Sequence, residues 1–107
     1  MTIYIDDAYA SDRFVTRVRS DRLAAMIGTD LDELHKFARK IGLTEMSYDG
    51  GYYHVPAQER RKAVLLGAVE CPVRIVAAMH SLRLMGEDPE PASTAWARRN
   101  AIARSLT

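Results

Sequence analysis

The sequence predicts an α/β fold: a small mixed sheet with flanking helices, plus a C-terminal helical pair. Short apolar segments of strand character alternate along the chain with segments of helical periodicity, which is typical of α/β domains. The length of 107 residues is that of one domain. We expect residues 1–71 to form the α/β core and residues 72–107 to form a helical extension packed on the same domain.

The first predicted strands lie near the N-terminus. Residues 2–6 are mostly apolar and end at two adjacent carboxylates. The segment Arg13–Arg19 alternates weakly with a period of two, which is compatible with a strand that has one solvated face. The more apolar segment Leu23–Ile27 is the other candidate for the second strand.

The clearest predicted element is a helix over residues 29–42. Its apolar residues fall on one helical stripe: Leu31, Leu34, Phe37, Ala38 and Ile41. Thr29 suits the N-cap, and acidic residues gather in the first turn, where the helix dipole favours negative charge. Gly42 suits the position that ends the helix. We expect Leu34, at the centre of the stripe, to be fully buried.

A hairpin and a second helix are predicted next. The hairpin covers residues 45–55, because Asp49-Gly50 is a strong turn signal between strand-like residues. The helix begins at Pro56, which suits a first helical position, and ends at Gly67. The segment Ala68–Cys71 has the composition of a short buried strand.

The C-terminal helical pair follows. The third helix begins at Pro72 and ends at Gly86, and it carries an apolar stripe: Ile75, Val76, Met79, Leu82 and Met85. The last helix is expected to start with Ser93 or Thr94 as its cap and to end near Leu106. Trp96 is the only large aromatic side chain of this helix, so we expect it to anchor the helix.

Three segments resemble the DUF4031 family of small bacterial and phage proteins. They are MTIYIDD, AAMIGTDLDELHKFARKIGL and YYHVPAQERRKAVLLGAVE, and they cover about residues 1–71. The resemblance implies a domain type and a phage-borne or bacterial cytoplasmic protein, without implying an activity. Members of the family tend to carry a His in the second strand and a His-Tyr-Asp run before the second helix. Here Ala25 and Tyr52-Tyr53-His54 stand at those places.

Composition and charge bear on the cellular compartment of the protein and on the kind of partner that it can bind. Residues 1–51 carry seven Lys and Arg against nine Asp and Glu, and residues 52–107 carry eight against five, so the C-terminal half is mildly basic. Such an asymmetry permits an anionic partner. No apolar run reaches the ~18 residues that a membrane-spanning helix needs. Cys71 is the only cysteine, which suits the reducing cytoplasm of a bacterial host.

One candidate ligand-binding region lies around the start of the second helix. Tyr52, Tyr53 and His54 lead directly into the helix N-terminus, and Arg60 and Arg61 follow within the helix. Backbone N–H groups at a helix N-terminus bind phosphate, and aromatic side chains beside basic ones suit the stacking of bases. The alternative is a hairpin packed on the core beside solvated arginines.

A second candidate is the basic C-terminal helix. Arg98, Arg99 and Arg104 occur there without any acidic residue. They are candidates for contact with nucleic acid or with an acidic protein partner, and a homo-oligomer is a further option. The alternative is an ordinary solvated helix face.

The acids at the end of the first strand suggest a divalent metal. Asp6 and Asp7 are successive residues, so on a strand they point to opposite faces. Mg²⁺ prefers several oxygen ligands from more than one element, and His54 and Asp49 are candidates to join Asp6. The alternative is a solvated strand end. His35 lies off the apolar stripe, and no metal-binding motif includes it.

These observations lead to two hypotheses about function. The leading one is a small non-catalytic binding or regulatory protein that recognises an anionic ligand, nucleic acid or a host protein through the region Tyr52–Arg61 and the basic C-terminal helix. The alternative is a metal-assisted, phosphoesterase-like hydrolase that uses Asp6, Asp7 and His54. No Ser or Cys lies in a nucleophile motif, so sequence motifs alone do not decide between them.

Overall fold

A computed structural model describes residues 2–7 and 23–106. Its centre is a five-stranded mixed sheet with the strand order β3-β4-β2-β1-β5. The strands are β1 (Ile3–Asp6), β2 (Leu23–Gly28), β3 (Tyr48–Asp49), β4 (Tyr52–Pro56) and β5 (Val69–Cys71). β1 pairs in parallel with β5, and all other neighbours are antiparallel. The predicted mixed sheet and the hairpin are confirmed.

The strand candidate Leu23–Ile27 is confirmed as β2. The competing candidate, Arg13–Arg19, lies outside the described residues.

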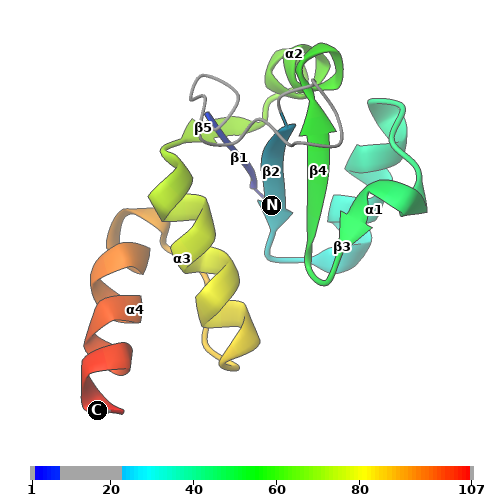
Figure 1. Ribbon diagram of the computed structural model, residues 1–107. Coiled ribbons are helices and arrows are strands. Elements are labelled where there is room, and N and C mark those ends of the chain that lie inside the picture. The colour runs from blue at the N-terminus through cyan, green and yellow to red at the C-terminus, as the bar shows by residue number, and fades with distance from the viewer. Residues whose placement is uncertain (1, 8–22, 107) are drawn as a thin grey trace.

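Helices cover both faces of the sheet. They are α1 (Leu31–Lys40), the short 3₁₀ helix η3 (Glu45–Ser47), α2 (Ala57–Leu65), α3 (Val73–Leu84) and α4 (Ala92–Ser105). Figure 1 shows α1 on one side of the sheet, and α3 and α4 next to each other on the other side. The C-terminal helical pair is therefore confirmed, and α3 packs directly on β1 and β2. No helix of the described residues is long and apolar enough to cross a membrane.

Strand alternation divides the core into two clusters. Ile3 and Ile5 of β1 face α1 and α2 and pack with Leu34, which is fully buried as predicted. Tyr4, between them in sequence, faces the opposite side and packs with Met79 of α3. The face that a strand residue occupies therefore decides which helices it meets.

The cap of α1 differs from the prediction by one residue. Asp30 is the N-cap, and its Oδ1 accepts hydrogen bonds from the N–H groups of Asp32 and Glu33 at 2.9 and 3.3 Å. The hydroxyl of Thr29 donates instead to Glu90, in the linker before α4. Both side chains are suitable caps, so the sequence alone could not choose between neighbours.

Within the predicted segment Ala68–Cys71, residues Val69–Cys71 form the strand β5; Ala68, just before it, is buried, but the expected burial of the strand itself is wrong. Val69 and Glu70 are exposed because β5 lies at the edge of the sheet and pairs with β1 alone among the described strands. Apolar composition indicated a buried strand, whereas position in the sheet sets the burial.

The contact that anchors α4 also differs from the prediction. Trp96 is 41% exposed, and Ala95 is the residue of α4 that is fully buried against α3. A small residue at this place lets the two helix backbones approach closely. The predicted caps are wrong as well, because α4 begins at Ala92 after Pro91 and has no side-chain cap.

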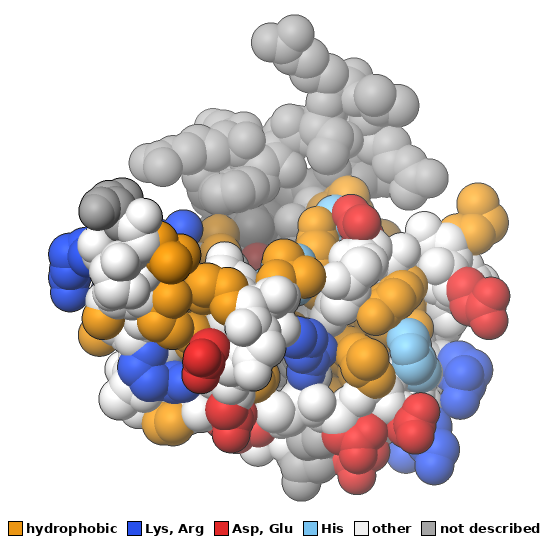
Figure 2. All heavy atoms as spheres, turned by 90° about the horizontal axis from the view of Figure 1, so that it is seen from below, with side chains coloured by type: hydrophobic (Ala, Val, Ile, Leu, Met, Phe, Trp, Pro, Cys, Tyr) orange, Lys and Arg blue, Asp and Glu red, His pale blue; other side chains and the backbone are white. Residues whose placement is uncertain are grey.

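Large apolar side chains are exposed near the C-terminal ends of α3 and α4. They are Leu84, Met85 and Leu106. Figure 2 looks at this end of the molecule and shows hydrophobic side chains on the side where α3 and α4 lie. Such a surface is compatible with self-association, and the homo-oligomer stays a prediction.

Candidate functional site

The two N-terminal acids have different surroundings. Asp6 is only 3% exposed, and its main-chain carbonyl accepts a hydrogen bond from Nε of Arg60 at 3.0 Å. Asp7 is exposed, and its Oδ1 accepts a hydrogen bond from the N–H of Val73, the first residue of α3, at 3.2 Å. Asp7 therefore satisfies one of the free N–H groups at the start of α3.

The sheet register relates Asp6 to His54. His54 pairs with Ala25 of β2, and the β1–β2 register, continued from the Ile5–Met26 pair, places Asp6 on the other side of Ala25. The two side chains thus share a face but are two strands, roughly 10 Å, apart at the backbone. In residues 2–7 and 23–106, no three His, Cys, Asp or Glu side chains form a group that could hold a metal ion.

The five residues of the predicted binding region do not converge. Tyr53 is buried on the α1 face of the sheet, and its neighbours Tyr52 and His54 lie on the α3 face because side chains alternate along β4. Tyr52 donates to Asp49 at 3.3 Å, and Nε2 of His54 lies 3.2 Å from the same carboxylate. Both contacts are made within the hairpin, between β4 and Asp49 of β3.

The two arginines of the region also separate. Arg60 is buried, and besides its bond to β1 it donates to Glu70 of β5 at 2.8 Å. Arg61 is exposed on α2. Arg60 therefore connects α2 to two strands.

Some arginines of the basic helix α4 make contacts within the protein. Arg98 donates to the carbonyl oxygens of Asp88, Pro89 and Pro91 and so attaches the linker to the helix. The guanidinium of Arg99 lies 5.8 Å from the ring centroid of Trp96, within cation–π range. Arg104 is exposed. The three arginines therefore do not form one uniform basic surface.

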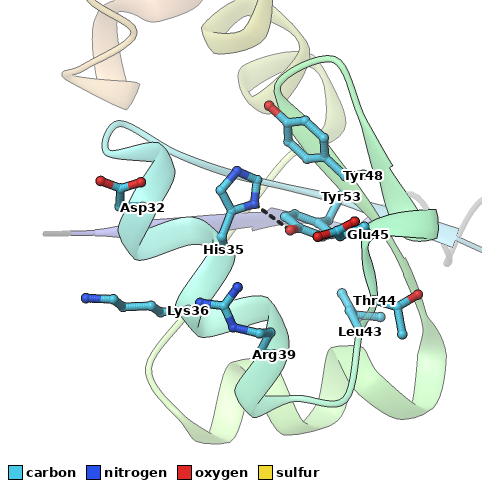
Figure 3. A pocket seen from close by; sticks show the side chains of 9 residues that line it. All are labelled: Asp32, His35, Lys36, Arg39, Leu43, Thr44, Glu45, Tyr48 and Tyr53. Atoms are coloured by element: carbon cyan, nitrogen blue, oxygen red, sulfur yellow. Dashed lines mark hydrogen bonds between the residues drawn. The ribbon is translucent and has the colours of Figure 1, made fainter.

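A cleft of about 770 Å³ opens between α1 and the β3–β4 hairpin (Figure 3). We call it the α1–hairpin cleft, and it is lined by Asp32, His35, Lys36, Arg39, Leu43, Thr44, Glu45, Tyr48 and Tyr53. Helix α1 contributes one wall, and η3 with the hairpin contributes the other. Tyr53 is the only lining residue that the sequence had identified as a site candidate.

A histidine–tyrosine pair lies at the centre of the cleft. Nδ1 of His35 is 2.6 Å from the hydroxyl oxygen of Tyr53. The ring of Tyr48 packs against both, with centroid distances of 4.9 Å to His35 and 5.1 Å to Tyr53. The three rings meet at steep angles and form a compact aromatic cluster.

The surroundings of Tyr53 keep its hydroxyl protonated. Burial raises the pKa of the Tyr53 hydroxyl, and Tyr48 and Glu45 raise it further, while Arg39 lowers it. Tyr53 is therefore protonated at neutral pH. The hydroxyl both donates and accepts, so the direction of its hydrogen bond with Nδ1 follows the tautomer of His35.

Two cations of α1 line the cleft without an internal partner. Among the described residues, neither Lys36 nor Arg39 forms an ion pair or a side-chain hydrogen bond. Figure 3 shows the guanidinium of Arg39 beside the His35–Tyr53 pair, with Lys36 extending away from it. Other arginines are engaged in internal hydrogen bonds: Arg60, Arg83 and Arg98.

Half of the eight cleft residues that the sequence analysis missed come from α1. His35 and Arg39 are four residues apart and so lie on the same side of the helix. This spacing was readable from the sequence. The partner wall was not, because it depends on how α1 packs against the hairpin.

Comparison with known proteins gives one family. Residues 3–83 match the family described as protein of unknown function (DUF4031). The match extends beyond residue 71, where the resemblance was expected to end, and includes the whole α1–hairpin cleft and nearly all of α3. No curated protein and no solved structure matches the chain.

Proposed function

We propose that this chain, which belongs to the DUF4031 family, is a binding protein for a small anionic ligand held in the α1–hairpin cleft. The observation that carries the proposal is Arg39. Its guanidinium lies beside the His35–Tyr53 pair and has no ion-pair partner among the described residues. A guanidinium binds phosphate or carboxylate through two parallel hydrogen bonds.

The size and lining of the cleft support a small-molecule ligand. Its volume of about 770 Å³ falls within the usual range for ligand sites, ~300–1,000 Å³. Six of its nine lining residues are charged or polar, which is more than in most small-molecule sites and suits a charged ligand.

Binding is favoured over catalysis by the residues present. The lining contains no Ser or Cys, and the imidazole of His35 is bonded to a tyrosine that stays protonated. The proposal keeps the class of function expected from the sequence and moves the site to α1. Nucleic-acid or protein contacts through Arg98, Arg99 and Arg104, and a phage-borne protein of the bacterial cytoplasm, stay predictions.

Inorganic phosphate is the simplest probe. Titration should shift the imidazole resonances of His35 in NMR spectra, and calorimetry should give a dissociation constant near or below the millimolar range. Arg39→Gln should weaken binding about tenfold or more, since a hydrogen bond to a charged group contributes roughly 1.5–3 kcal/mol.

Arg61→Gln is the matched control, because it removes an exposed arginine on α2 outside the cleft. Its affinity for phosphate should equal that of the wild type. Equal loss in both variants would mean that only net charge matters, and absence of any His35 shift would refute binding in the cleft.

A further inference from the structure

The end of the β3–β4 hairpin lies beyond the last pair that β4 makes with β2. These two strands pair as far as Tyr53, opposite Met26. Residues 48–52, which we call the hairpin tip, comprise β3, the two-glycine turn and the first residue of β4. Among the described strands, β3 pairs with β4 alone. The position of the tip therefore depends on contacts with the helices on either side of the hairpin, α3 and α1 (Figure 1).

Two side chains of α3 hold the tip against the sheet. Arg83 donates one hydrogen bond to the carbonyl oxygen of Gly51, at 3.4 Å, and another to that of Gly28 at the end of β2. His80, three residues earlier and so on the same side of α3, packs against the ring of Tyr52 with a centroid distance of 4.9 Å. Its imidazole also lies directly against Gly51, since a Cβ there would be 3.1 Å from Cε1 and 3.3 Å from Nδ1. The tip therefore packs on a titratable ring.

The packing around His80 suits a neutral imidazole. Its Nδ1 is buried and has no hydrogen-bond partner in the described part of the chain. A protonated imidazole carries a proton on both nitrogens, so Nδ1–H would be a buried donor without an acceptor. Burial and the positive charge of Arg83 lower the pKa of His80, although Asp49 opposes them. Uptake of a proton by His80 therefore disfavours the packed arrangement.

The charged and titratable groups around His80 belong to α3 and to the hairpin. Arg83 is on the same helix, and the hairpin contributes three groups: Asp49, Tyr52 and His54. The Asp49 carboxylate accepts a hydrogen bond from Tyr52 at 3.3 Å and lies 3.2 Å from Nε2 of His54. Protonation of His54 strengthens its contact with this carboxylate. Of the two histidines, only His80 therefore favours release of the tip in acid.

The core cluster beneath α3 contains two further titratable groups, Tyr4 and Cys71. Burial raises the pKa of both, so they stay uncharged while His80 titrates. They therefore do not contribute to the response in acid.

The hairpin tip is also part of the α1–hairpin cleft. Tyr48 belongs to the tip, lines the cleft and packs on His35 of α1 with a centroid distance of 4.9 Å. Tyr48 faces α1, whereas Tyr52 of the same tip faces α3. Movement of the tip away from α3 therefore also displaces a wall of the cleft.

We propose that His80 is a pH-sensitive switch: when its imidazole takes up a proton, the hairpin tip leaves α3, and the cleft without this wall does not hold its anion. The release of the tip stands on the contacts of α3 alone, and only its effect on the anion rests on the proposed function. The released tip binds the proton more readily than the packed one, so release increases as pH falls below about 6.5. Each unit by which packing lowers the pKa of His80 allows roughly a tenfold increase in the released population.

NMR relaxation dispersion measures a minor released state that forms on the microsecond-to-millisecond timescale. At the amides of Tyr48 and Gly51, the released population should rise roughly tenfold between about pH 7.5 and about pH 5. The amides of Ile5 and Ile27, inside the sheet, should not change. An equal rise at all four amides would mean that the whole sheet opens, which would overturn the switch.

His80→Phe removes the titration and keeps an aromatic ring against Tyr52. The released population of this variant should be the same at both pH values. His54→Gln is the matched control, because it removes the other histidine that contacts Tyr52, and it should keep the rise of the wild type. If thermal melting shows that His80→Phe does not fold, His80→Gln, which cannot titrate either, takes its place. A rise equal to that of the wild type without His80 would overturn the proposal.

Sulfate tests the effect on the cleft, because its charge is constant over this pH range. If the anion binds only the packed state, sulfate at about ten times its dissociation constant should lower the released population roughly tenfold near pH 5. Sodium chloride at the same ionic strength should not. Sulfate that binds without changing the released population would overturn the link to the cleft and leave the proposed function standing. No binding of sulfate near pH 7.5, with the acid response of the tip intact, would remove the proposed function and leave the release of the tip standing.

Discussion

Replacing Leu34 with Ala should destabilise the fold strongly. The side chain is fully buried among Ile3, Met26 and other members of the α1-side core. Leu34→Ala deletes three buried carbon atoms, and at about 0.8 kcal/mol each the transfer contribution alone is about 2.4 kcal/mol. The cavity left behind adds to this, so the total loss should be about 2.5–5 kcal/mol.

Urea denaturation followed by far-UV circular dichroism measures this loss. Leu31→Ala is the matched control, because it makes the same change in the same helix at a side chain that is 41% exposed. The control should lose about 1.4 kcal/mol, since a side chain that is 41% exposed keeps only about three-fifths of the 2.4 kcal/mol transfer contribution and leaves no closed cavity. A loss below about 0.5 kcal/mol for Leu34→Ala, or equal losses for both variants, would refute the orientation of α1 on the sheet.

Three further predictions concern the α3 side of the sheet. Asp7→Ala should lower the free energy of unfolding by roughly 1 kcal/mol in the same assay, because it removes the acceptor at the start of α3. Burial and the neighbouring Arg83 lower the pKa of His80, although Asp49 opposes them, so the unfolded state binds the proton more readily. Stability should therefore fall as pH drops below about 6.5, and His80→Gln should reduce this slope. Gly51→Ala should destabilise more than Gly67→Ala: both have positive φ, but only the Gly51 Cβ would meet a side chain, 3.1 Å from Cε1 of His80. Equal melting temperatures for the two glycine variants would contradict that contact.

The elements with strong local patterns were predictable from the sequence. The apolar stripe of α1 predicted which side of the helix is buried, and Asp49-Gly50 predicted the hairpin. Both features depend on residues that are close together in the chain. Errors arose where packing decides. Trp96 is large enough to anchor α4, but its position on the helix leaves it 41% exposed. β5 has apolar residues, but it lies at the edge of the sheet and is therefore exposed.

The site was harder to predict than the fold. Tyr52, Tyr53 and His54 were grouped because they are adjacent in sequence, yet adjacency in a strand separates side chains by face. His35 and Arg39 were distant in sequence from Tyr53 and came together only through the packing of α1 on the hairpin. A row of polar residues indicates which side of a helix faces a cleft or solvent. It does not indicate which element packs on the other side of that cleft.

The hairpin turn determines which tyrosine reaches the α1–hairpin cleft. Gly50 and Gly51 form a two-residue turn and have φ values of 58° and 124°, in the positive range that type I′ turns require. This turn pairs Tyr48 with Tyr53, so both rings point toward α1. A shift of the register by one residue would send Tyr53 to the α3 face and place a neighbour against His35. The His35–Tyr53 pair, and with it the proposed anion site, therefore depends on the two glycines of the turn.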